Sequence, residues 1–189
     1  MSAAGRVWRF GDAVNTDQII PGRANVTTDP AALARGCFGE CRPEFAARVR
    51  PGDVIVAGED FGCGSSREHA VIAIQAAGIR AVVAASFARI FFRNAVNLGL
   101  PLLEGTAAAG TLADGALIEL DLAAGRLIEP TTGAVLQSRP LSAFAARIAR
   151  HGGVLDLVRA HGSLRGDCSA ACGPLTPATT PQGGPTDDR

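Results

Sequence analysis

The chain has 189 residues, of which 47% are hydrophobic and 5% aromatic, a composition typical of one α/β domain with a substantial core. Eighteen basic residues balance eighteen acidic ones without forming a basic stripe, which gives no electrostatic support for a nucleic-acid partner. The N-terminus has no signal-peptide pattern and no apolar run approaches the roughly 18 residues of a membrane helix, so we expect a cytoplasmic protein without a membrane partner.

Cysteine usage favours reduced thiols over disulfides or a metal site. The five cysteines are an odd number, which suits a reducing compartment better than a secreted disulfide framework. Cys37 and Cys41 are separated by three residues, as are Cys168 and Cys172, and neither pair has the spacing of a zinc or iron–sulfur site. We therefore expect free thiols and no metal bound by this chain.

The first fifty residues show little periodicity. They predict a short strand over 7–10 and a polar loop over 11–22 that ends in a turn signal. Asp29, followed by proline, is typical of a helix start. Because the segment 25–50 is otherwise irregular, we expect it to lie over the surface.

From residue 51 the pattern alternates between strands and helices. The predicted elements are a strand over 53–57, a helix over 66–77, a strand over 80–85, a helix over 88–98 and a strand over 100–103. Gly78 and Gly99 end the two helices. This alternation predicts right-handed βαβ crossovers and parallel strands. Phe91 and Phe92 fall on the apolar spacing of the second helix and are predicted to be core residues.

The remainder of the chain predicts short strands, a helix and a tail. Short strands are expected near 117–122, 127–128 and 135–136. A final helix is predicted over 141–150, and its apolar pattern continues to Val158. Beyond Ser163 the sequence is rich in small and polar residues without periodicity, so we expect one domain over 1–162 and a disordered tail over 163–189.

The segment 61–69, with the sequence Phe-Gly-Cys-Gly-Ser-Ser-Arg-Glu-His, is the most informative in the chain. It joins a predicted buried strand to a predicted helix, where free backbone N–H groups and the helix dipole attract small anions. Gly64 permits close approach of a ligand to the backbone, and Arg67 adds a planar cation suited to a carboxylate or phosphate. Ser65 and Ser66 place two hydroxyl groups beside that cation.

The same segment has other interpretations. Ser65 and Glu68 fit a capping box, in which the hydroxyl only satisfies a helix N–H group. A dinucleotide-binding loop fails because Arg67 stands where a third glycine is required. A hydrolase nucleophile elbow fails because neither serine lies in Gly-x-Ser-x-Gly. His69, one turn after Ser65, is a candidate activating base without an identifiable acid partner.

Charged residues elsewhere have both structural and functional interpretations. Asp17 suits a turn or cap, yet its carboxylate is also a candidate anchor for Arg67. Arg89 and Arg93 suit ion pairs in solvent or at the edge of the core. They also stand where they could face a crevice at the ends of the predicted parallel strands. These alternatives stay open on the sequence alone.

Four sequence blocks together resemble the swivel domain of the aconitase superfamily. The blocks span 11–22, 52–58, 61–70 and 86–94. The resemblance covers about residues 7–158, and the stand-alone size is similar to that of the small subunits of 3-isopropylmalate dehydratase and homoaconitase. It implies a swivelling β/β/α fold with a parallel βαβαβ core and added short β-strands.

The resemblance also implies an activity and roles for particular residues. The activity is that of a hydro-lyase in leucine biosynthesis, which dehydrates and rehydrates a substituted malate. Ser65 would be the base that takes a proton from the carbon α to a carboxylate, and Ser66 and Arg67 would bind that carboxylate. Supporting roles would belong to Asp17, Gly64, Glu68, His69 and Arg89. A 4Fe-4S cluster would be carried by a large partner subunit, since this chain lacks the cluster ligands, so the chain would be inactive alone.

Substrate choice is expected to depend on the segment 23–30. By resemblance, homoaconitase-type members carry an arginine near Val26 and isopropylmalate enzymes an apolar residue, so Val26 and the neighbouring Thr27 favour an alkyl-substituted malate. The chain departs from the common pattern at Ala24 and Asn25, and Arg23 is a candidate substitute cation. Homoaconitate, dimethylmalate or a specialised-metabolism analogue are the alternative substrates, and a non-catalytic anion-binding module is the alternative outside enzymes.

Overall fold

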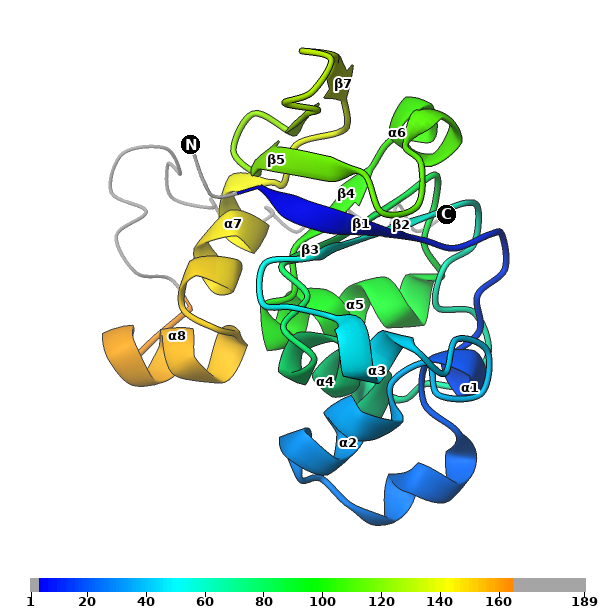
Figure 1. Cartoon of the computed structure of the whole chain (residues 1–189). Coiled ribbons are helices and arrows are strands. Elements are labelled where there is room, and N and C mark those ends of the chain that lie inside the picture. Colours follow the sequence, from blue (N-terminus) through cyan, green and yellow to red (C-terminus); the bar gives the residue numbers. More distant parts are fainter. Residues whose placement is uncertain (1–3, 165–189) are drawn as a thin grey trace, which may run out of the picture.

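The computed structural model describes residues 4–164, and within them seven strands form one sheet in the order β4-β3-β2-β1-β5-β6-β7 (Figure 1). The strands are β1 (Gly5–Arg9), β2 (Val54–Ala57), β3 (Ala81–Ala84), β4 (Leu102–Glu104), β5 (Leu117–Asp121), β6 (Arg126–Ile128) and β7 (Val135–Gln137). β1 to β4 are parallel neighbours, and β5 to β7 extend the sheet in antiparallel pairs. The predicted parallel βαβαβ core with added short strands is confirmed.

The helices cover this sheet unequally. They are α1 (Thr16–Ile19), α2 (Pro30–Gly36), α3 (Phe45–Arg48), α4 (Glu68–Ala76), α5 (Arg89–Leu98), α6 (Thr106–Thr111), α7 (Ala143–Arg150) and α8 (Val154–His161), with a 3-10 helix η1 (Gly22–Val26). α1 to α5 lie on one side of the parallel strands, and α6 lies with β5 to β7 on the other (Figure 1). α7 and α8 pack beside α5.

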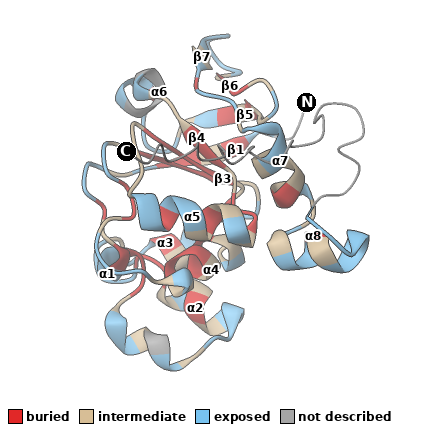
Figure 2. Ribbon diagram, turned by 180° about the vertical axis from the view of Figure 1, so that it is seen from behind, coloured by how far each residue is buried: buried red, intermediate tan, exposed pale blue. Residues whose placement is uncertain are grey.

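Both faces of the parallel strands are buried, because successive side chains of a strand point to opposite faces. Ile55 and Ala57 of β2 join the core beneath the helices. Val54 and Val56 of the same strand join a second core, which includes Ile118 of β5. Figure 2 shows the buried residues concentrated in these strands and on the sides of α4 and α5 that face them. A strand buried on both faces has a continuous apolar sequence, as 54–57 does.

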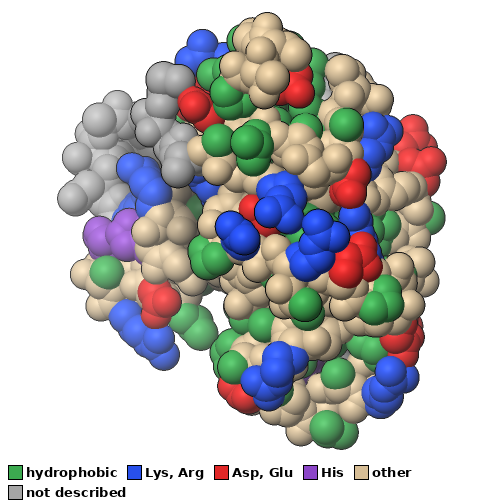
Figure 3. Space-filling view, in the orientation of Figure 1, with side chains coloured by type: hydrophobic (Ala, Val, Ile, Leu, Met, Phe, Trp, Pro, Cys, Tyr) green, Lys and Arg blue, Asp and Glu red, His purple; other side chains and the backbone are tan. Residues whose placement is uncertain are grey.

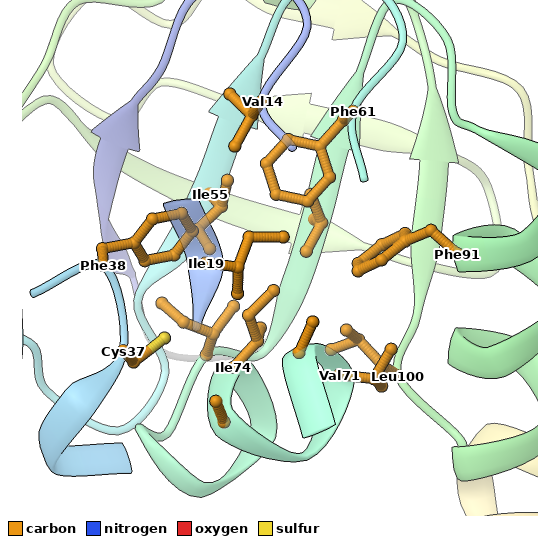
Figure 4. Packing of buried hydrophobic residues seen from close by; sticks show 14 of the residues in the cluster. Val14, Ile19, Cys37, Phe38, Ile55, Phe61, Val71, Ile74, Phe91 and Leu100 are labelled. Atoms are coloured by element: carbon orange, nitrogen blue, oxygen red, sulfur yellow. The ribbon is translucent and has the colours of Figure 1, made fainter. Parts of the chain in front are cut away.

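The core beneath the helices draws on segments far apart in the sequence. Ile19 of α1, Phe38, Phe61 and Phe91 of α5 come together around Ile55 (Figure 4). The Phe61 and Phe91 rings meet edge to face with centroids 5.2 Å apart. The segment 61–69, called the candidate loop below, therefore has its first residue anchored in the hydrophobic core.

The expectation that 25–50 lies over the surface is wrong. Leu33, Phe38 and Phe45 are fully buried, and the Phe38 and Phe45 ring centroids are 4.9 Å apart. Phe45 also packs edge to face on Trp8 of β1, with centroids 4.8 Å apart. Isolated aromatic residues produce no periodicity in an irregular segment, although each buries a large apolar surface.

The predicted core role of Phe92 is also wrong. Phe91 is 2% exposed, whereas Phe92 is 36% exposed. Consecutive residues of a helix point about 100° apart, so both rings cannot share one narrow face. The predicted end of this helix is confirmed, because Gly99 adopts the left-handed conformation with φ of +79°.

The predicted final helix is two helices. Gly152 and Gly153, with φ of +81° and +130°, separate α7 from α8. The backbone there approaches the end of α5 so closely that a Cβ on Gly99 would lie 2.7 Å from the Gly153 nitrogen. The loop predicted over 11–22 likewise contains the short helix α1, which the sequence analysis did not predict. The tail predicted over 163–189 lies outside the described residues, apart from 163–164.

Candidate active site

Three loops meet at the carboxyl edge of the parallel strands, the edge at which open α/β sheets bind ligands. In the loop after β2, the Gly62 N–H donates to the Val14 carbonyl of the loop after β1 at 2.7 Å. The Phe61 N–H donates to the Ser86 carbonyl after β3 at 3.1 Å, and the Ala88 N–H donates to the Phe61 carbonyl at 3.0 Å. The candidate loop is therefore held from both sides by backbone hydrogen bonds.

Gly62 and Gly64 give this loop its tight path. Their φ angles are +81° and +93°, a region that L side chains rarely adopt. A Cβ on Gly62 would overlap the Phe91 ring, so the absence of a side chain also lets the loop pack directly on α5.

The Arg67 guanidinium lies against α1. Its Nη1 forms an ion pair with Oδ1 of Asp17, the interaction for which the sequence offered Asp17 as a candidate. The Arg67 side chain is 19% exposed and that of Asp17 is 58% exposed. A Cβ on Gly22, the first residue of η1, would lie 3.5 Å from Nη2 of Arg67. The pair therefore joins the candidate loop to the segment that leads to Val26.

The capping box considered as an alternative interpretation of Ser65 and Glu68 does not form. α4 begins at Glu68, two residues later than predicted, and its N-cap is Arg67, which makes no capping hydrogen bond with its side chain. Arg67 is extended, with φ of −120° and ψ of 111°. Ser65 and Ser66 precede the helix and are exposed. The start of α4 therefore has no side-chain cap, and both serines lie directly before the N-cap residue.

Cys63 lies in the same loop and differs chemically from the serines. Its thiol donates to the Ala13 carbonyl at a sulfur–oxygen distance of 3.4 Å. Burial, with a smaller contribution from the negative charge of Asp60, raises the pKa of the Cys63 thiol. The Cys63 thiol is thus directed at the backbone, whereas Ser65 and Ser66 are exposed and their hydroxyls are the better placed to meet a substrate.

The remaining candidate residues near α4 and η1 differ in exposure and in hydrogen bonding. Glu68 is exposed in the first turn of α4, and His69 beside it is partly buried. Val26 is 92% exposed at the end of η1. The hydroxyl of Thr27 accepts a hydrogen bond from the Asp29 N–H at 3.1 Å, which places Thr27 in the connection to α2.

Arg89 lines a cavity elsewhere on the described surface. It stands at the start of α5 and lines a cavity of about 460 Å³ between α5 and α7, together with Arg93, Phe92 and Phe144. No residue of the segment 61–69 lines this cavity. The structure therefore groups Asp17, Gly64, Ser65, Ser66 and Arg67 in one place, whereas Arg89 lines the cavity between α5 and α7.

Sequence reasoning missed two residues of this arrangement. Thr16 is 1% exposed, and its N–H donates to the Cys63 carbonyl at 2.9 Å. Gly22 lies beside the Arg67 guanidinium. The available signal was Asn15 and Gln18, which form a capping box and so mark the start of a helix in the polar loop.

Within residues 4–164, no three His, Cys, Asp or Glu side chains are grouped as a metal site would require. In the same part of the chain, none of the helices has the length and apolar character needed to span a bilayer.

On the face seen in Figure 3, basic side chains have acidic neighbours, a mixture in keeping with the balanced formal charge.

Comparison with known proteins gives consistent matches. The family model of the aconitase C-terminal domain matches residues 42–105. The 3-isopropylmalate dehydratase small subunit 1 of Methanopyrus kandleri is 52% identical over 158 residues, covering 84% of this chain and 93% of that protein. The 3-isopropylmalate dehydratase small subunit of Thermodesulfovibrio yellowstonii is 46% identical over 156 residues, covering 82% of this chain and 93% of that protein.

A solved structure agrees with the sequence matches. The crystal structure of 3-isopropylmalate dehydratase (leuD) from Methanocaldococcus jannaschii superimposes with a TM-score of 0.80 at 42% identity. The alignment covers 86% of this chain and 96% of that one. The similarity therefore extends over nearly the whole length of the relative.

Proposed function

The chain belongs to the family of 3-isopropylmalate dehydratase small subunits within the aconitase superfamily, and we propose that it supplies the serine base and the carboxylate-binding residues of such an enzyme. The reaction is the interconversion of 2-isopropylmalate and 3-isopropylmalate by dehydration and rehydration in leucine biosynthesis. One observation carries the proposal: Ser65, Ser66 and Arg67 lie together at the uncapped start of α4, with Arg67 paired to Asp17.

Removing a proton from the carbon α to a carboxylate requires a strong base. An unperturbed seryl hydroxyl keeps its proton far above neutral pH, so a seryl alkoxide needs positive potential around it. The amino-terminal end of the α4 dipole and the Arg67 guanidinium are the sources of that potential. Ser65 would take the proton, and Arg67 would stabilise both the alkoxide and the substrate carboxylate.

Arg67 retains donors for a substrate. Asp17 engages Nη1 of the guanidinium, and a guanidinium has five N–H donors arranged as a planar fork. The remaining donors can bind a carboxylate with two parallel hydrogen bonds. The Ser66 hydroxyl, adjacent and exposed, would add a further contact.

The described part of this chain does not fit an iron–sulfur cluster. Cys37 is fully buried, and within residues 4–164 the cysteines are not gathered with one another or with His, Asp or Glu into a group of three that could hold a metal ion. Departure of the substrate hydroxyl calls for a Lewis acid. We propose that a large partner subunit carries a 4Fe-4S cluster for that purpose.

An alkyl-substituted malate fits the segment 23–30 better than a substrate with a third carboxylate. Arg23 is the only basic residue in that segment, and its Nη1 lies 2.5 Å from Oε1 of Glu40. The ion pair holds the candidate substitute cation against Glu40. Val26 presents an exposed isopropyl group, so we propose 3-isopropylmalate over homoaconitate, dimethylmalate or a specialised-metabolism analogue. The free thiols of the described cysteines support assembly in the cytoplasm.

The experiment is co-expression with a cluster-bearing large subunit under anaerobic conditions. We expect the two chains to co-purify and to hydrate isopropylmaleate, and we expect this chain alone to be inactive. A panel with homoaconitate and dimethylmaleate measures the preference. Binding of small carboxylates by the isolated chain without a stable partner would instead favour a non-catalytic anion-binding module.

Val26→Arg tests the substrate proposal within the same complex. The added cation is expected to lower kcat/KM for isopropylmaleate and raise it for homoaconitate, changing the ratio by about tenfold or more. Val135→Arg, at an exposed valine of β7, is the matched control for an added cation elsewhere on the chain. An unchanged ratio in Val26→Arg would show that this segment does not select the substrate.

A further inference from the structure

Thr16 makes two hydrogen bonds to the candidate loop. Its N–H donates to the Cys63 carbonyl at 2.9 Å, and its Oγ1 donates to the Ser65 carbonyl at 3.2 Å. Thr16 is 1% exposed, so its side chain is fixed by its surroundings. One buried residue thus holds the backbone on both sides of Gly64.

The element that carries Thr16 is itself rigidly defined. The Asn15 side chain accepts from the Gln18 N–H at 2.8 Å, and the Gln18 side chain accepts from the Asn15 N–H at 2.8 Å. Asp17, the next residue of the same turn, pairs with Arg67. The first turn of α1 therefore contacts both ends of the Ser65–Arg67 tripeptide.

The Ser65 carbonyl needs such an anchor because of its neighbours. Gly64 has φ of +93° and no side chain, so it allows rotation of the peptide that leads into Ser65. No side chain caps α4, so the helix itself does not fix the orientation of Ser65 through a capping bond. Through the Ser65 carbonyl, the Thr16 hydroxyl constrains the next peptide, the one between Ser65 and Ser66.

We propose that Thr16 is a positioning residue, whose hydroxyl sets the direction of the Ser65 side chain by holding the Ser65 carbonyl. This inference rests on the proposed role of Ser65 as the base. It divides the work of α1 between two neighbours: Thr16 positions the proton acceptor, and Asp17 positions the carboxylate-binding Arg67. A small misplacement of a reacting group lowers the rate far more than it lowers substrate affinity.

The test is Thr16→Val in the complex with the large subunit. Valine has nearly the same shape and lacks the donor, and only one part-buried hydrogen bond is lost, so the fold is expected to persist. We expect kcat to fall about 10- to 100-fold, with KM within about twofold of wild type. Thr16→Ser, which keeps the hydroxyl, should restore most of kcat.

Thr132→Val is the matched control for loss of a threonine hydroxyl. Thr132 donates to Oε2 of Glu129 at 2.7 Å in the turn before β7, and its removal should leave kcat unchanged. Wild-type kcat in Thr16→Val, or an equal loss in Thr16→Val and Thr16→Ser, would overturn the inference.

A second readout does not depend on activity. Amide hydrogen exchange in the full chain should speed up at residues 16 and 62, whose N–H groups bond between the two loops, in Thr16→Val and not in Thr16→Ser, while β2 and α4 stay protected. Unchanged exchange at residues 16 and 62 would overturn the inference. If the wild-type complex has no hydratase activity, the proposed function fails, and the exchange result alone then decides the role of Thr16.

Discussion

Among individual residues, Arg67 and Asp17 carry the proposed recognition of the substrate. They are fifty positions apart in the sequence, yet the parallel pairing of β1 with β2 brings the loops after both strands to one edge. The ion pair is partly exposed, so its direct effect on stability is small. Its consequence is the orientation of a planar cation at the start of α4.

Asp17→Asn should therefore impair binding more than folding. Without its charged partner, Arg67 samples other rotamers, and we expect KM for isopropylmaleate to rise about tenfold, equivalent to roughly 1.4 kcal/mol. Steady-state kinetics of the complex and a thermal unfolding scan make the comparison. Asp156→Asn, which removes an exposed pair with Arg159 in α8, is the control. An unchanged KM in Asp17→Asn would show that this ion pair does not contribute to substrate binding.

The sequence predicted some of these residues and not others, for identifiable reasons. Ser65 and Arg67 follow a buried strand, and that local pattern suffices to predict an anion site. The capping box at Ser65 was an alternative interpretation drawn from an equally local pattern. It does not form, since α4 begins at Glu68, and the Ser65 carbonyl instead accepts from Thr16, 49 positions away. Contacts between residues this far apart leave no local sequence pattern.

Among the elements, the segment between η1 and β2 is attached to the sheet through Arg42. The Nη2 atom of Arg42 lies 2.6 Å from Oδ2 of Asp114, and the Nη1 atom of Arg42 donates to the Arg9 carbonyl at 2.9 Å. The guanidinium also lies over the Trp8 ring, 4.8 Å from the centroid. This network links the segment before β2 to the end of β1 and to the turn before β5.

The network predicts a pH dependence of stability. The hydrogen bond from Arg42 lowers the pKa of Asp114 below its usual value. A carboxyl group with a lowered pKa stabilises the fold above its unfolded pKa, near pH 4, and this contribution is lost as the pH falls through the folded pKa. We expect Asp114→Asn to unfold at a lower temperature than wild type at neutral pH, and the difference to shrink toward about pH 2.

Thermal unfolding of both proteins across this pH range makes the measurement. Asp156→Asn serves again as a control, because its pair in α8 is exposed. A difference between Asp114→Asn and wild type that stayed constant down to the acidic limit would contradict the assignment of the pH dependence to Asp114.

The bounds of the helices and strands show where the sequence pattern was sufficient to predict an element. The parallel strands and α5 follow apolar runs and a terminal glycine, and the structure matches them closely. The break between α7 and α8 occurs at two adjacent glycines, a signal that the continuing apolar pattern concealed. The burial of Phe38 and Phe45 depends on partners in β1 and had no periodic signature.

In the whole molecule, the order of the strands explains why the candidate site is exposed. The loops after β1, β2 and β3 emerge at one edge of the sheet, and their hydrogen bonds to one another form a continuous rim. Ser65 and Ser66 are exposed on that rim. This arrangement suits a site completed by a second polypeptide, as expected for one subunit of a two-subunit enzyme.

The most direct test of Ser65 as the base is kcat of the reconstituted complex with Ser65→Ala, beside Ser66→Ala. The account predicts that Ser65→Ala lowers kcat by at least about 100-fold, the contribution of a positioned base, while KM changes little. Ser66→Ala should mainly raise KM. A Ser65→Ala complex that turns over isopropylmaleate at the wild-type rate would contradict the central claim.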